Sequence, residues 1–135
     1  VDGRLYFVSS KRRYLFTLGL DDGTYCREST IKGEFTGQPD QVKYLHGDSD
    51  VLYISEEKDN NQYSGVYGRK LNGRQFPILI AGDTIRGDIG GIAFSPDNMH
   101  MYVAFLRMGK LYDITREDNQ PFHGSTLDVK YSKKK

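Results

Sequence analysis

The sequence predicts an all-β fold, a partial β-propeller of about three four-stranded antiparallel blades with little or no helix. A core of consecutive apolar and aromatic residues recurs three times, and its tyrosines, Tyr6, Tyr53 and Tyr102, lie 47 and 49 residues apart. A period of about 40–50 residues is typical of propeller blades. No window of about eleven residues shows helical periodicity. An open meander or a sandwich is the rival architecture, and the long regular period favours the propeller.

Strands are predicted on both sides of each core. The cores themselves give strands over residues 5–8, 51–54 and 101–104. Strands before the second and third cores are expected over 40–45 and 90–95. The strands that follow the cores, over 14–20, 65–71 and 109–115, carry aromatic residues at matching positions, namely Phe16, Tyr67 and Tyr112. A last strand is expected in each unit over 24–30, 75–81 and 126–132.

These strands group into three units over residues 1–36, 37–86 and 87–135 of one propeller segment. Turns are indicated at Asp22-Gly23 and Asn72-Gly73, because Asx and Gly residues tolerate positive φ. The first unit lacks its first strand, so the chain holds about two and three-quarter blades, whereas propellers close with about 4–8. An open arc exposes strand edges and an apolar blade face. We therefore expect missing propeller blades or partner protein subunits to cover it; the chain is a remnant of a longer one, pairs with another copy, or docks on a partner.

Composition and charge exclude several classes of function. The 135 residues carry a net charge of +1, which gives no global field for nucleic acid or a membrane surface. The single cysteine, Cys26, rules out an internal disulfide and a cysteine-rich zinc site. No apolar stretch is long enough for a transmembrane helix. We expect no nucleic-acid partner and no transmembrane segment.

Carboxylates form the main candidate chemical cluster. Glu56 and Glu57 end a core strand and Asp59 follows them, while Asp40 and Asp88 precede innermost strands. Calcium accepts six to eight oxygen ligands in loose geometry, so these residues are candidate calcium ligands. Asp40 and Asp88 are expected to face the propeller axis, where missing blades would supply further ligands. The alternative interpretation is a polar connecting loop in the first case and hydrogen bonds to turn amides in the second.

Other motifs carry no chemistry. The glycine-rich segment 87–91 lacks the Gly-Lys-Ser/Thr ending of a phosphate loop, and no helix is expected after it. The histidines His46, His100 and His123 have no ligand-like spacing. No serine has the strand-turn-helix context of a catalytic nucleophile.

Once the units are aligned, the chain resembles the C-terminal part of the PhoX-like alkaline phosphatase family. The resemblance is carried by two passages, residues 37–42 leading to 52–56, and residues 91–97 leading to 101–104 and 113–118, and by the ending 121–131. It implies a larger parent protein with calcium and iron at a central site that hydrolyses phosphate monoesters. It also implies a secreted or organelle-lumenal location, because the family is usually exported.

The chain departs from this family at the catalytic positions. The family's Arg-Pro-Glu motifs supply an arginine for phosphate and a glutamate for metal. Their places are taken here by Gln38-Pro39-Asp40 and Asp88-Ile89-Gly90, and Cys26 does not match the iron-binding cysteine. We therefore expect a non-catalytic propeller segment that acts as a rigid docking subunit. The alternatives are the C-terminal part of a calcium-dependent phosphatase and a structural calcium-binding module.

Overall fold

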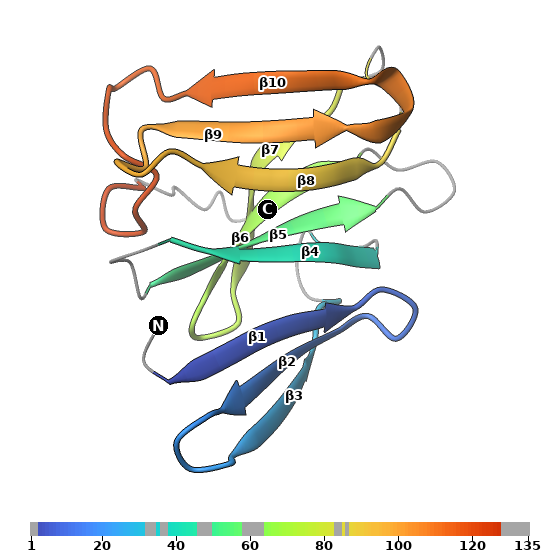
Figure 1. Cartoon of the computed structure of the whole chain (residues 1–135), viewed down its shortest axis with the longest axis vertical. Coiled ribbons are helices and arrows are strands. Elements are labelled where there is room, and N and C mark those ends of the chain that lie inside the picture. Colours follow the sequence, from blue (N-terminus) through green and yellow to red (C-terminus); the bar gives the residue numbers. More distant parts are fainter. Residues whose placement is uncertain are drawn as a thin grey trace, which may run out of the picture.

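The computed structural model describes residues 3–31, 35, 38–45, 50–57, 64–82, 85 and 87–127. Three separate antiparallel sheets make up this part of the chain (Figure 1). The first sheet holds β1 (Arg4–Ser9), β2 (Tyr14–Gly19) and β3 (Tyr25–Ser29) in that order. The second holds β4 (Gln38–Tyr44), β5 (Val51–Glu57), β6 (Gly65–Lys70) and β7 (Gln75–Ile80), again in chain order.

The third sheet holds β8 (Ile89–Phe94), β9 (His100–Phe105) and β10 (Lys110–Thr115) in order. A short 3-10 turn, η1 (Leu106–Met108), joins β9 to β10 and ends at Gly109 in the left-handed conformation. The prediction of an all-β chain of antiparallel sheets is confirmed, and every predicted strand from residue 5 to residue 115 has its counterpart. The predicted strand 126–132 is the exception, because Thr126 lies in a turn and residues 128–132 lie outside the described residues.

The three sheets are stacked face to face, with the second sheet in the middle (Figure 1). Their inner strands lie side by side, since β4 contacts β1 on one side and β8 on the other. Among the described residues the sheets do not join into a closed ring. The central strand β5 is buried from Val51 through Glu56. A strand covered on both faces shows no polar alternation, which explains its near-continuous apolar sequence.

The larger part of the core lies between the second and third sheets. Its buried members include Tyr53 and Val66 from the second sheet and Met101, Val103 and Phe105 from the third. A smaller cluster on the opposite face of the second sheet contains Ile54 and Tyr67 with Phe35 from the connection to the first sheet.

Bulges interrupt the first strand of the second and third sheets at corresponding places. The register shifts between Pro39 and Val42 in β4 and between Ile89 and Gly91 in β8. A side-chain amide joins the two bulges, because Gln41 Nε2 donates to the carbonyl oxygen of Gly90 over 2.7 Å. Bulges bend a strand and redirect its side chains, so these two give the inner ends of β4 and β8 a shared, irregular backbone.

The predicted Asx-Gly turns are confirmed. Gly23 and Gly73 have φ angles of 66° and 82°, a region that glycine enters without steric cost. The Asp22 carboxylate accepts a hydrogen bond from the Thr24 amide at 2.9 Å, and Asn72 does the same for Arg74 at 3.0 Å. In the part of the chain that is described, no helix is long and apolar enough to cross a membrane.

We predict that Met101→Ala lowers the free energy of unfolding by about 2–5 kcal/mol, because a buried methionine leaves a cavity between the second and third sheets. Leu20→Ala is the control, since Leu20 is 62% exposed after β2 and its truncation changes stability by about 0.5 kcal/mol or less. Urea denaturation measures both. Equal effects of the two substitutions would contradict the position of the core.

Candidate functional site

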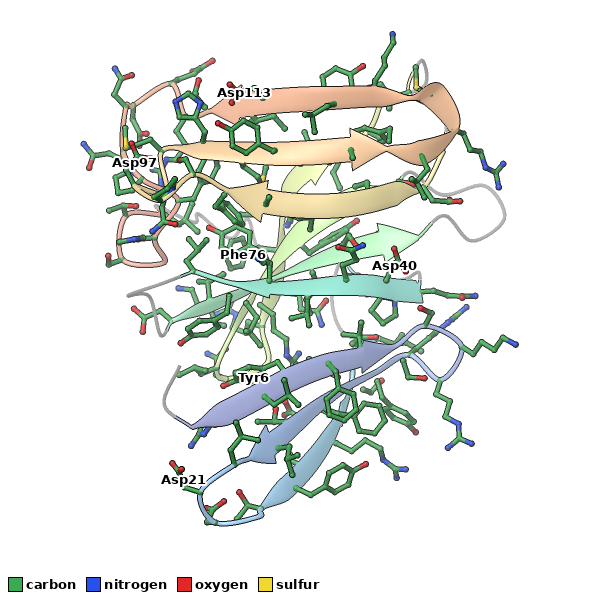
Figure 2. The ribbon with its side chains drawn as sticks, viewed as in Figure 1. Tyr6, Asp21, Asp40, Phe76, Asp97 and Asp113 are labelled. Carbon is green, nitrogen blue, oxygen red and sulfur yellow. The ribbon has the colours of Figure 1, made fainter. Side chains whose placement is uncertain are left out.

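An aromatic contact between successive sheets recurs twice in the structure. Tyr6 on β1 stacks on Tyr44 of β4, with ring centroids 5.8 Å apart and planes 5° apart. Tyr53 on β5 packs against Phe94 of β8 edge to face, with centroids 4.8 Å apart. Figure 2 shows Tyr6 between the first and second sheets. Each contact joins the repeated tyrosine of one sheet to an aromatic on the first strand of the next.

The partners of these tyrosines occupy equivalent positions. Tyr44 pairs across the sheet with Leu52, and Phe94 pairs with Met101. Leu52 and Met101 directly precede the repeated tyrosines of their own strands. The same position therefore packs on the same position from sheet to sheet, and Tyr6, Tyr53 and Tyr102 all point toward the following sheet.

The second set of aligned aromatics points the other way. Tyr67 lies with Ile54 in the cluster on the side of the first sheet, opposite Tyr53 on the same strands. Tyr112 packs in the core between the second and third sheets, where its ring meets Phe105 edge to face with centroids 5.6 Å apart. Phe16 takes the equivalent place in the first sheet. Its side chain therefore points away from the second sheet.

Phe16 is the centre of an open surface on the first sheet. Strand pairing places seven side chains on this surface, which we call the aromatic face: Leu5, Phe7, Tyr14, Phe16, Leu18, Tyr25 and Arg27. Phe7 and Phe16 stack with centroids 4.9 Å apart, and the Arg27 guanidinium lies 4.7 Å from the centre of the Tyr14 ring. Leu5, Phe7 and Tyr25 are 48%, 42% and 61% exposed. Large apolar side chains gathered on one exposed face mark an interaction site.

The far side of the third sheet is the second open surface. We call it the tyrosine face and define it by six residues: Ala93, His100, Tyr102, Ala104, Leu111 and Asp113. The His100 ring stacks on Tyr102 at 6.1 Å, and His100 Nδ1 lies 2.8 Å from Asp113 Oδ1. Leu111 is 68% exposed, and Figure 2 shows Asp113 on the outer strand β10. Tyr102 stands where Tyr6 and Tyr53 stand in the other sheets.

A polar contact also joins the first and second sheets. Arg69 is buried on β6, and its Nη2 atom lies 2.7 Å from Glu28 Oε2 on β3. Gln75 Nε2 donates to the carbonyl oxygen of Thr30 at 3.0 Å nearby. A cavity of about 300 Å³ beside this pair is lined by residues of both sheets, including Cys26. Sequence reasoning missed this contact; alternation along β6 puts Arg69 on the same face as Tyr67, but no sequence signal identifies Glu28.

The structure brings two of the five predicted calcium ligands together. Asp40 lies on β4 beside its bulge, and Asp88 directly precedes β8 (Figure 2). Partial loss of hydration raises the pKa of Asp40, and the charge of Asp88 raises it further. Arg107 Nη2 lies 3.6 Å from Asp88 Oδ2 and opposes a cation there.

The other three predicted ligands do not join this pair. Glu56 is buried on β5, on the face that carries Ile54. Glu57 is the last residue of β5, and Asp59 lies outside the described residues. In the described ranges, no three His, Cys, Asp or Glu side chains gather as metal ligands would. The calcium site stays a prediction.

The pKa of Asp40 yields a test of this geometry. A raised pKa means that the folded state holds the Asp40 proton more tightly than the unfolded state, so ionisation of Asp40 at neutral pH opposes folding. Asp40→Asn is expected to raise the midpoint of thermal unfolding at pH 7, and this gain is expected to vanish well below pH 3.8, where both states are protonated.

Asp97→Asn is the control with the opposite sign. Hydrogen bonds from the Ser95 hydroxyl and the Met99 amide lower the pKa of Asp97. Its stabilising effect is present above pH 3.8 and is lost as the pH falls through the lowered pKa, so Asp97→Asn destabilises the protein at pH 7. If Asp40→Asn destabilises the protein in the same way, Asp40 does not lie beside Asp88 as described.

The site is therefore a pair of open sheet faces with opposite orientations in one repeating series. Neither face has a counterpart to guide its interpretation, because comparison with protein-family models, curated proteins and solved structures finds no match.

Proposed function

We propose that the chain is a non-catalytic segment of a β-propeller and acts as a rigid docking subunit. It binds other propeller blades or partner protein subunits through the aromatic face and the tyrosine face. One observation carries this proposal: the side-chain positions that fill the two interfaces inside the stack are open at its two ends.

The energetics of the repeat support docking. Tyr53 and Val103 are fully buried between sheets, and burial of apolar surface stabilises by about 25 cal/mol per Å². Phe7 and Phe16 occupy the positions of Ile54 and Tyr67, yet one side of their sheet is uncovered. A further sheet placed there would gain the same kind of burial. The aromatic face therefore fits a sheet surface better than a small ligand.

The internal contacts also support a rigid role. The Arg69–Glu28 ion pair and the hydrogen bond from Ser10 Oγ to the Pro39 carbonyl, 2.7 Å long, tie the first sheet to the second. The Gln41–Gly90 hydrogen bond ties the second to the third. Bonds at each junction fix the angle between sheets, so the two open faces keep a constant relative orientation.

A matched pair of substitutions at one repeat position tests the docking role. Tyr67→Ser is expected to lower the free energy of unfolding by about 3 kcal/mol or more, because Tyr67 is buried between sheets. Phe16→Ser, at the equivalent open position, is expected to cost about 1 kcal/mol. Denaturant titration of dilute protein measures both values.

A dye that fluoresces on exposed apolar surface provides the second readout. The unmodified chain is expected to bind it, and the Phe7→Ser/Phe16→Ser variant is expected to lose most of that binding. A cost for Phe16→Ser as large as for Tyr67→Ser would show that the aromatic face is part of an internal core, which would contradict the docking role.

The two alternative functions are tested by activity and by calorimetry. The approach of Asp40 to Asp88 is the observation that favours a structural calcium-binding module. We expect the chain alone to show no calcium-dependent hydrolysis of a phosphate monoester, because the family's arginine positions are lost and the described residues gather no three-ligand cluster. Measurable hydrolysis would favour the phosphatase alternative. Absence of calcium binding at millimolar concentration would dispose of the calcium module.

A further inference from the structure

We propose that the aromatic face of one copy binds the tyrosine face of a second copy, so that two chains associate head to tail. This inference rests on the proposed docking function and names its partner. The two faces are the two unfilled ends of one directional series within the same chain, and each presents what the other lacks.

The direction of the series selects the head-to-tail arrangement. Tyr6 and Tyr53 each pack on the sheet that follows them, and Tyr102 points the same way with no described sheet beyond it. The aromatic face has the orientation of the surfaces that receive these tyrosines. A contact between two aromatic faces would reverse the direction, and no interface inside the described part of the chain has that form.

The sizes of the side chains on the two faces are complementary. On the tyrosine face, Tyr102 is flanked by Ala93 across the strand pair and by Ala104 two residues along β9. On the aromatic face, Phe7 and Phe16 stand side by side as bulky neighbours. Small residues around one projecting ring leave room for large side chains from the opposite surface, which is how packed layers interdigitate.

The charges are complementary as well. Cross-strand pairing puts Arg27 in line with Phe16 on β3, the outer edge of the first sheet among the described strands. It puts Asp113 in line with Tyr102 on β10, at the corresponding edge of the third sheet. Inner strands lie beside inner strands in the stack, so continuing it brings β3 over β10 and Arg27 to Asp113. The Arg69–Glu28 pair already bridges two sheets inside the chain in this manner.

A pair of chains also satisfies the geometry of closure. Each chain supplies three sheets, and two chains joined by two such contacts supply six, within the range of about 4–8 blades that closes a propeller. Head-to-tail contacts give a ring when the rotation between units closes. Both open faces of both chains are then covered.

Charge reversal with mixing tests this arrangement. Sedimentation equilibrium is expected to show a dimer of the unmodified chain. Arg27→Glu and Asp113→Arg are each expected to weaken self-association by about tenfold or more, because each places like charges at both contacts. Arg12→Glu, in the exposed turn after β1, makes the same charge change outside both faces and is expected to have no effect.

The decisive sample is an equimolar mixture of the Arg27→Glu and Asp113→Arg chains. In a head-to-tail pair of one chain of each kind, the two substituted side chains face each other at one contact and carry opposite charges. The unsubstituted Arg27 and Asp113 face each other at the other contact, so the mixture is expected to regain the affinity of the unmodified chain.

A monomer at every accessible concentration, or a dimer that mixing does not restore, would overturn the inference. The comparison of Phe16 with Tyr67 tests the docking role separately, so the two failures can be told apart.

Discussion

A β-sheet with apolar residues on both faces needs a neighbour on each side, and this constraint governs the whole molecule. The second sheet meets it fully, because its central strand β5 is buried from Val51 to Glu56 between the first and third sheets. The outer sheets meet it on one side only. The inter-sheet contacts of Tyr6 with Tyr44 and of Tyr53 with Phe94 show how the sheets satisfy each other in one direction along the chain.

The same constraint made most of the fold predictable from sequence. Strands covered on both faces become continuous apolar runs, and these runs recur at the period of the structural unit, which is why aligning Tyr6, Tyr53 and Tyr102 located the central strand of every sheet. The orientation of Phe16, Tyr67 and Tyr112 follows from the same alignment. Glycine after Asp22 and Asn72 located two of the turns, because positive φ is a local requirement.

What sequence could not show depends on contacts between distant residues. The buried Arg69 meets Glu28 across 41 positions, and no periodicity encodes that choice. The joined bulges of β4 and β8 depend on a hydrogen bond from Gln41 to a backbone carbonyl, which residue type alone does not specify. The acidic residues illustrate the same limit: Asp40 and Asp88 come together, whereas Glu56 is buried on β5.

The central claim is that one repeat position is buried inside the stack and open at its end. Hydroxyl-radical footprinting of dilute protein, read by mass spectrometry, tests it most directly by comparing Tyr53 with Tyr102 in the same molecule. Tyr53 is expected to be protected, because it lies fully buried between the second and third sheets. Tyr102 is expected to be oxidised readily; if the two tyrosines react at the same rate, the account of an interrupted stack is wrong.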